Sequence, residues 1–226
     1  MFQKGNDVMS KVLSSENRVI VQNNVLKLLN TTQLMNDNTV NSPRAVGDAV
    51  QSFLKENFPA CVPDGLISKF HNKFSRRAMA DFAFEDSDGC YCVVDLKTHN
   101  LDTKFNRPNL TSVERLAKLY RNCKNYFALL LVSYKTDGNR LIFYDCKFVP
   151  IELLDWSCLT LGALGWGQIQ ITNSNNVIIN TDNTRKKWLL QLCDALDLFY
   201  PKEIVKINTR IEWFRKVREY WKNQPD

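Results

Sequence analysis

The sequence predicts a mixed α/β fold in which a central β-sheet is flanked by helices. Apolar residues recur at helical spacing toward both ends of the chain. Apolar, β-branched and aromatic runs of strand length fill its middle, and two polar connections between them contain Asp-Gly, a strong hairpin signal. The predicted order is helices, two strands, a helix, two strands, further short strands and two helices. This order is typical of a sheet with helices packed against it.

Five segments carry apolar residues with the spacing of an amphipathic helix. They cover residues 7–29, 44–58, 112–123, 184–199 and 203–221. The first is compatible with one helix or two, and a polar loop separates it from the second. The second is predicted to stop before Pro59, because the residue that precedes a proline avoids the helical conformation. Thr184 suits the N-cap of the fourth.

Six segments have strand character. They cover residues 80–84, 90–98, 126–134, 141–149, 166–172 and 175–180. The polar stretches EDSDG and KTDGNR separate the members of the first two pairs, so each pair is expected to form a hairpin. In WGQIQIT the glutamines alternate with isoleucines, which is the period of a half-buried strand.

With 226 residues, 44% of them hydrophobic and 24% charged, the chain is long enough to bury a core without metals or disulfides. No internal repeat and no Gly/Ser-rich or Pro-rich linker divides it, so we expect one domain over residues 1–226. No apolar run reaches the roughly 18–20 residues that span a bilayer. The N-terminus lacks the apolar stretch of a signal peptide. We therefore expect a cytoplasmic protein with no membrane partner.

The seven cysteines are an odd number, include no C-x-x-C pair and have only two histidines to complete a zinc shell. We expect them to be small, half-buried hydrophobic residues in a reducing compartment. Thirty Lys and Arg against 24 Asp and Glu give a net charge of +6. This excess of base favours an anionic partner such as nucleic acid. The alternative is a basic surface that serves solubility alone.

The segment MADFAFEDSDGCYCVVDLKTHN holds three charged residues in an arrangement suited to catalysis. Asp95 and Lys97 are two residues apart on a predicted strand, so their side chains project from the same face. Asp81, near the start of the partner strand, returns beside them if EDSDG forms the turn. The simpler alternative is an exposed ion pair between Asp95 and Lys97, worth roughly 0–1 kcal/mol.

Two carboxylates that converge within a few ångströms repel each other unless a cation lies between them. Mg²⁺ suits this position, since it takes hard oxygen ligands and needs only one or two protein carboxylates together with substrate phosphate. Lys97 would then place a positive charge near the scissile phosphate and hold, or help to deprotonate, the attacking water. These roles outline a metal-assisted phosphodiester hydrolase.

The order of helix, acid and acid-x-Lys resembles the PD-(D/E)xK nuclease superfamily, and within it the type II restriction endonucleases that leave blunt ends. The similarity is most specific from VVDLKTHNLDTKFNRPN into LTSVERLAKLYRNC, and it continues more weakly in RAVGDAVQSFLKENF and WGQIQIT. The resemblance implies a restriction-endonuclease-like fold with its catalytic core at about residues 44–135. It also implies that Asp81 and Asp95 hold Mg²⁺ and that Lys97 acts at the attacking water.

Members of this family often carry an acidic residue on the preceding helix, and the resemblance makes Asp48 the candidate for a catalytic role. Asp48 is shorter than the usual Glu, and Glu56 lies two turns further along the predicted helix. The alternative is that both are solvent-facing helix residues. The proline of the family motif is also replaced, since Ala80 precedes Asp81.

The resemblance further assigns two DNA-recognition elements, at about residues 99–112 and 162–172. Asn109 matches a base-contacting asparagine of the family. Together the expected DNA contacts are Thr98, His99, Asn106, Arg107, Asn109, Gln168 and Gln170. Asn and Gln pair bidentately with adenine, and Arg with guanine. The alternatives are ordinary turn chemistry for the loop and an ordinary exposed sheet face for the glutamines.

These expectations combine into a type II site-specific deoxyribonuclease, a Mg²⁺-dependent homodimer that cuts both strands of a short palindromic site in double-stranded DNA. Amides outnumber arginines in the recognition elements, which favours a mostly A·T site cut at its centre to leave blunt ends. Basic residues at 69–77 and 202–222 would contact phosphates. An Asn-rich chain can also reflect A·T-rich coding alone. Two other functions stay open: a repair or junction-resolving nuclease, and a DNA-binding module with an inactive centre.

Overall fold

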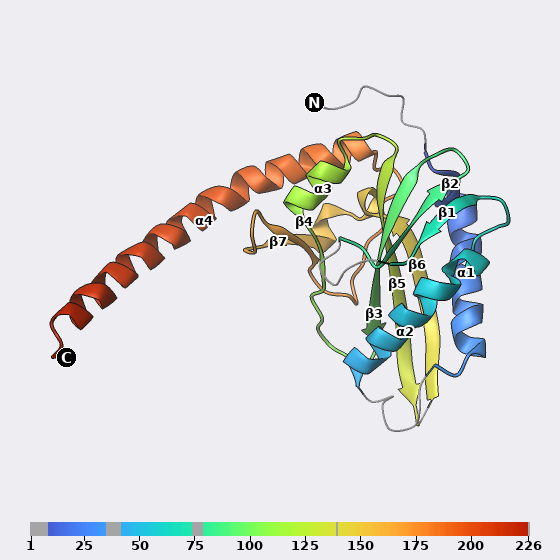
Figure 1. The fold of residues 1–226 in the computed structure, drawn as a ribbon, viewed down its shortest axis with the longest axis horizontal. Helices are drawn as coiled ribbons and strands as arrows, with labels where there is room; N and C mark the ends of the chain where they lie inside the picture. The colour runs from blue at the N-terminus through green and yellow to red at the C-terminus, as the bar shows by residue number, and fades with distance from the viewer. Residues whose placement is uncertain (1–8, 35–41, 74–78, 139, 226) are drawn as a thin grey trace.

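In the computed structural model, which describes residues 9–34, 42–73, 79–138 and 140–225, the chain folds around a five-stranded mixed sheet (Figure 1). In spatial order, its strands are β1 (Ile67–His71), β2 (Phe82–Asp86), β3 (Tyr91–Asn100), β5 (Asn125–Asp137) and β6 (Arg140–Pro150). β3 and β5 run parallel, and the other neighbours are antiparallel. The arrangement confirms the predicted mixed α/β fold.

A second sheet of three short strands lies beside the first. Its strands, in spatial order, are β4 (Asn109–Ser112), β8 (Gln168–Ile171) and β7 (Leu159–Gly162). β4 and the short helix α3 (Val113–Leu119) belong to the crossover that joins β3 to β5. A segment that leaves the large sheet at β3 therefore enters the small sheet before it returns.

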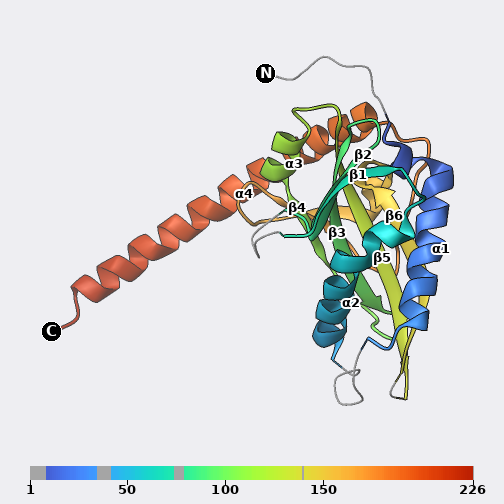
Figure 2. The same ribbon diagram turned by 45° about the vertical axis from the view of Figure 1, so that its right-hand side comes forward.

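Helices lie on both faces of the large sheet (Figures 1 and 2). α1 (Ser15–Thr31) and α2 (Pro43–Asn57) pack on one face, and α3, the start of α4 (Arg185–Lys222) and the second sheet pack on the other. Short 3₁₀ turns occur at Lys11–Leu13, Phe58–Cys61, Ile151–Leu153 and Trp156–Cys158. No helix in the described ranges is both long and apolar enough to cross a membrane.

Alternation along β3 decides which layer each of its side chains meets. Val94 and Leu96 enter the core shared with α1 and α2, whereas Val93 enters the core shared with α3, α4 and the second sheet. Because side chains alternate along a strand, Asp95 and Lys97 project toward the second sheet.

The N-terminal half of α2 is capped, and it lies close to the end of β3. The Ser42 hydroxyl accepts a hydrogen bond from the Ala45 amide at 3.3 Å, and Pro43 occupies the first turn, where no amide hydrogen is needed. At Gly47 a Cβ atom would lie 3.2 Å from the Thr98 hydroxyl. A glycine inside this helix therefore permits the close approach of its N-terminal half to the end of β3.

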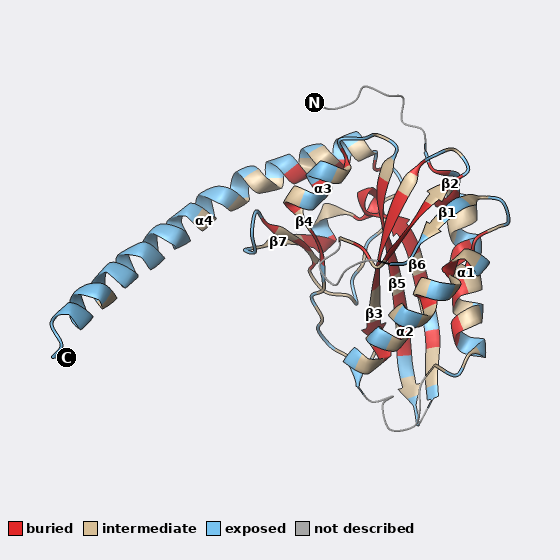
Figure 3. Cartoon of the chain, viewed as in Figure 1, coloured by how far each residue is buried: buried red, intermediate tan, exposed pale blue. Residues whose placement is uncertain are grey.

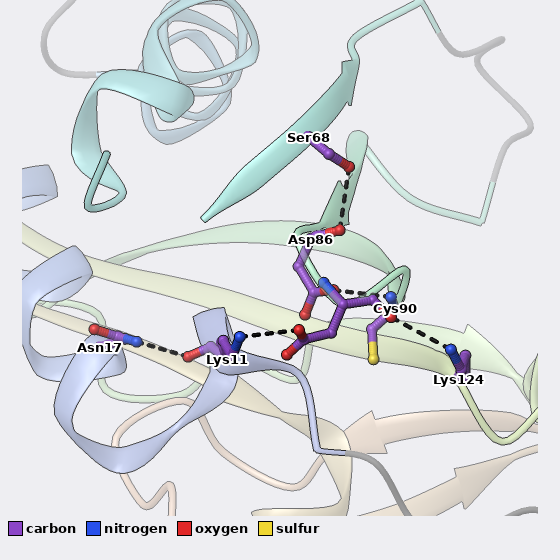
Figure 4. A network of polar contacts seen from close by, with 7 residues as sticks. Lys11, Asn17, Ser68, Asp86, Cys90 and Lys124 are labelled. Atoms are coloured by element: carbon purple, nitrogen blue, oxygen red, sulfur yellow. Dashed lines mark hydrogen bonds and ion pairs between the residues drawn. The ribbon is translucent and has the colours of Figure 1, made fainter. Parts of the chain in front are cut away.

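The turn between β2 and β3 is held by a buried aspartate (Figure 4). One carboxylate oxygen of Asp86 accepts hydrogen bonds from the amides of Asp88 and Cys90 at 2.9 and 2.8 Å. Gly89 has a φ of 74°, which favours glycine at this place in the turn. The Asp-Gly signal therefore predicts the hairpin correctly, and the turn sets the register that pairs Phe82 with Val94.

The structure differs from the sequence-based expectations in several elements. β1 was not predicted, because its exposed edge position leaves no clear alternation of apolar residues. The short strand predicted at 175–180 is wrong, since only an isolated bridge between Leu154 and Ile179 forms there. The two predicted C-terminal helices form one helix that includes Pro201, although Thr184 caps it as expected through the Lys187 amide.

The cysteines are free thiols, five of them buried, with Cys123 partly exposed and Cys193 exposed. Arg76 and Arg77, part of the basic segment 69–77, lie outside the described residues. The remaining basic side chains of this segment, Lys69 and Lys73, are exposed.

Candidate active site

The hairpin places Asp81 opposite Asp95. The Asp81 amide donates to the Val94 carbonyl at 2.9 Å, one residue before β2 begins. Phe82 pairs with Val94, so Asp81 is next in register to Asp95, and opposed residues share a sheet face. Lys97 is on that face too, and its ammonium group lies 2.8 Å from Asp95 Oδ1. The three residues singled out in the sequence therefore lie together.

Asp81 immediately precedes the first residue of β2. The edge of β3 beyond Val94 therefore has no β2 partner. β2 pairs with β3 only as far as Val94. Beyond that point the Leu96 amide donates to Asp81 Oδ2 at 2.7 Å, so the carboxylate takes the place of a strand partner. Asp81 Oδ1 accepts from the side-chain amide of Gln51, which reaches across from α2. Both oxygens of Asp81 are thus held in place.

Asp95 is almost completely buried, with 6% of its surface exposed. Oδ1 accepts from Lys97, but no donor among the described residues contacts Oδ2. Burial raises the pKa of the Asp95 carboxyl to about 7, against the opposing effect of Lys97, and the nearby Asp81 charge raises it further. A buried carboxylate oxygen without a donor, beside a second carboxylate, is a position that favours a cation.

Because the folded-state pKa of Asp95 lies above the ordinary 3.8, the stability associated with its protonated form is present below pH 4 and is lost as pH rises through about 7. Asp95→Asn removes this cost. We expect the variant to gain roughly 2–3 kcal/mol more in unfolding free energy, relative to wild type, at pH 8 than at pH 5. Urea denaturation in a metal chelator measures this difference.

The same substitution at the exposed Asp48 serves as the control. An Asp95→Asn effect that is equal at both pH values would contradict the raised pKa.

α2 brings Gln51 to the site, which the sequence analysis did not single out. Asp48 is exposed one turn earlier on α2, and Glu56 is exposed further along. Among the described residues, the α2 side chain that contacts Asp81 is that of Gln51. Gln51 follows Gly47 by four residues and so lies on the helix face that approaches β3. The helix predicted to contribute an acid therefore contributes an amide at the position of contact.

The residues present fit a hard divalent cation. The available donors are oxygens: the carboxylates of Asp81 and Asp95 and, if its amide turns over, the Gln51 carbonyl. The described residues contain no cluster of three or more Asp, Glu, His or Cys side chains. Mg²⁺ needs only one or two carboxylates when water and substrate phosphate complete its shell. The pair of aspartates is therefore sufficient for a magnesium site and unsuited to a structural zinc site.

We expect Gln51→Ala to weaken Mn²⁺ binding and Gln51→Glu to preserve or strengthen it, because a carboxylate supplies the same oxygen with added charge. Asp48→Ala, on the same helix, tests the other assignment and should leave Mn²⁺ affinity within about threefold. Titration calorimetry measures all three. A loss in Asp48→Ala with none in Gln51→Ala would return the accessory role to Asp48.

The two segments predicted to read DNA pair with each other in the second sheet. Asn109 in β4 is opposite Gln170 in β8, and Ser112 is opposite Gln168. Gln170 Nε2 donates to Asn109 Oδ1 at 2.6 Å. Ile169 and Ile171 are buried and alternate with the partly exposed glutamines, so both side-chain amides lie on the outer face as the alternation predicts. The sequence analysis predicted two separate recognition elements. In the structure their strands pair and form one polar surface.

The rest of the predicted DNA-contact set divides into exposed and enclosed residues. Arg107 is exposed and lies over the Phe105 ring, 5.4 Å from its centroid, while Asn106 is partly exposed. Thr98 faces α2 at Gly47, on the opposite side of β3 from Lys97. His99 is buried and its Nε2 lies 2.8 Å from Asn175 Oδ1. His99 is therefore enclosed beside Asn175, whereas Thr98 is partly exposed on the side of the sheet that α2 covers.

Asn175 connects His99 to the loop that carries the predicted DNA contacts. Its amide donates to the carbonyls of Thr103 and Lys104 at 3.0 and 3.2 Å. The Ser174 amide donates to the Asn106 carbonyl at 2.8 Å. The loop after β3 is thus tied to the segment after β8, and its position depends on residues about 70 positions away in the chain. Local turn signals in the sequence do not predict these long-range hydrogen bonds.

The sheet face that carries Asp95 and Lys97 continues to a second lysine. Lys97 is in register with Leu131 of β5, which is in register with Lys147 of β6. Lys147 forms an ion pair with Asp145, two residues earlier on the same strand. Lys97, Asp145 and Lys147 also line one small cavity beneath the loop. Two ammonium groups therefore lie on one face of the sheet beside the aspartate pair.

The chain matches no protein-family model and no curated protein sequence.

Proposed function

We propose that the protein is a Mg²⁺-dependent type II restriction endonuclease that cuts both strands of a short palindromic DNA site. The observation that carries the proposal is the Asp95 carboxylate, buried opposite Asp81 with one oxygen free of donors and Lys97 on the same face. A mixed sheet with α2 packed across the end of this hairpin agrees with the expected restriction-endonuclease-like fold.

Mg²⁺ bound by Asp81 and Asp95 would supply positive charge to the scissile phosphate and increase the acidity of water there. The hydrogen bonds from Leu96 and Gln51 hold Asp81 in the orientation that binding needs. Lys97 pairs with Asp95 when no phosphate is present. Lys97, which lies on the same face as both aspartates, would hold the attacking water and stabilise charge on the phosphate.

The polar surface of β4 and β8 is the proposed base-reading element. Gln170 donates a hydrogen bond to Asn109, which restrains both side-chain amides on the exposed surface. Each amide can pair with the N6 and N7 atoms of adenine in the major groove. The cation–π contact with Phe105 positions Arg107 on the exposed loop beside them. The recognition surface and Lys97 are joined through the loop after β3, so base reading and chemistry share one support.

The metal and lysine roles are tested by single-turnover cleavage. Asp81→Ala and Asp95→Ala should abolish cleavage in Mg²⁺ while specific DNA binding in Ca²⁺ survives, because each removes a ligand and leaves the reading surface intact. Lys97→Ala should lose several orders of magnitude in the cleavage step with a smaller effect on metal binding. Arg140→Ala, on an exposed strand end, is the control.

Cleavage by Asp95→Ala at a rate near that of wild type would show that the centre lies elsewhere. Specific binding without cleavage by the wild-type protein in Mg²⁺ would favour an inactive DNA-binding module. Cutting that follows branched structure and ignores sequence would favour a junction-resolving nuclease.

The predominance of amides on the reading surface predicts a palindromic target that is mostly or wholly A·T and cut at its centre. Sequencing the ends of digested genomic DNA should therefore return one short A·T-rich consensus with blunt ends. Asn109→Ala should weaken cleavage of this site by about 10–100-fold and relax preference at one base pair, since each bidentate contact is worth about 1–3 kcal/mol. A G·C-rich consensus or staggered ends would contradict the prediction.

A further inference from the structure

The C-terminal part of α4 extends away from the body as a single helix (Figures 1 and 2). The buried residues of α4 are Trp188 and Leu192, both near its start. From residue 200 to 222, a segment called the arm below, all side chains are exposed except those of Glu203 and Val217, which are partly exposed (Figure 3). At 1.5 Å per residue the arm is roughly 33 Å long.

One face of the arm carries large residues at alternating intervals of four and three. This arm stripe consists of Tyr200, Ile204, Ile207, Ile211, Phe214, Arg218 and Trp221. Intervals of four and three over three heptads place these residues on one seam of a helix, the a and d positions of a coiled coil. Six of the seven are apolar or aromatic, and 38–67% of the surface of each of those six is exposed.

The arm is poorly suited to remain a helix in water by itself. It is rich in isoleucine, valine, tryptophan, phenylalanine and tyrosine, which have lower helix propensity than alanine or leucine. Helices in proteins gain most of their stability by packing an apolar face. The apolar and aromatic residues of the arm stripe nevertheless stay 38–67% exposed, so its sequence is that of a helix that meets another helix.

We infer that the arm stripe is the surface by which two copies of this chain associate, arm against arm. A helix with the same a and d spacing is required on the other side, and a second arm supplies one of equal length and period. From the exposed fractions, the two stripes together can bury roughly 1,200 Å², which reaches the range of stable protein interfaces. The inference shares with the proposed function only the expectation of a two-fold homodimer.

The charges beside the arm stripe select the antiparallel orientation. In a parallel pair, Arg210 at a g position would lie beside Arg215 at the e position of the second copy, a like-charge contact. An antiparallel pair centred between Ile211 and Phe214 avoids this contact. It also places Trp221 of the second copy opposite Ile204, where Ile204, Ile207 and Gly165 line a groove of about 420 Å³ between the arm and the turn after β7. The end of one arm thus meets the body of the other copy.

Sedimentation equilibrium of the full chain, without DNA and in a metal chelator, tests the interface separately from nuclease activity. We expect wild type to be a dimer, and Ile211→Glu to raise the dimer Kd by roughly 100-fold or more because it places charge at the centre of the stripe. Thr209→Glu adds the same charge on the opposite face of the arm and should change the Kd by less than about threefold.

Circular dichroism, at concentrations where both wild type and variants are monomers, checks that the variants keep the wild-type helix content. Phe214→Glu repeats the sedimentation test at a second position of the arm stripe. A wild-type protein that stays monomeric at about 100 µM would overturn the inference. So would a dimer that tolerates both stripe variants, or one that Arg215→Glu tightens, since tightening is the signature of a parallel pair. Loss of cleavage activity with an intact arm-dependent dimer would count against the proposed function alone.

Discussion

Burying a carboxylate beside a second carboxylate costs free energy unless a cation or a set of donors compensates it. The hairpin of β2 and β3 imposes this cost at Asp95, which has Asp81 opposite it and Lys97 as an ion-pair partner. Lys97 satisfies one oxygen, and no donor in the described part of the chain reaches the other. The proposed magnesium site, the proposed role of Lys97 at the attacking water and the expected pH dependence of stability all follow from this uncompensated oxygen, Asp95 Oδ2.

The surrounding fold keeps this arrangement in place at several points. The Asp86 turn fixes the register of the hairpin, and because β2 begins only at Phe82, the Leu96 amide has no β2 backbone partner and holds Asp81. Gly47 lets α2 approach β3 closely enough for Gln51 to reach the same carboxylate. The crossover after β3 then carries Asn109 into the second sheet. The proposed catalytic site and the proposed recognition surface are therefore placed by the same strand, one at its middle and the other beyond its end.

Much of this was predictable from short-range patterns. The period of two in β3 predicts that Asp95 and Lys97 share a face, and the Asp-Gly turn predicts that Asp81 returns beside them. Gln51 was missed because a glutamine on an amphipathic helix carries no local signal, and its contact with Asp81 spans 30 residues. The same limit explains the assignment of His99 to the DNA surface, since its burial depends on Asn175 in a distant loop. The sequence predicted two helices, over residues 184–199 and 203–221. They form one helix that continues through Pro201, and its second half carries the heptad pattern of the arm stripe.

Anomalous diffraction from crystals soaked in MnCl₂ tests most directly whether the aspartate pair is a cation site. We expect an anomalous peak within roughly 2.0–2.4 Å of one Asp81 oxygen and of Asp95 Oδ2, with the Lys97 ammonium group moved away from Asp95. The peak should be absent from crystals of Asp95→Asn. A wild-type crystal at millimolar Mn²⁺ with no peak between the two carboxylates, and Lys97 still paired with Asp95, would contradict it.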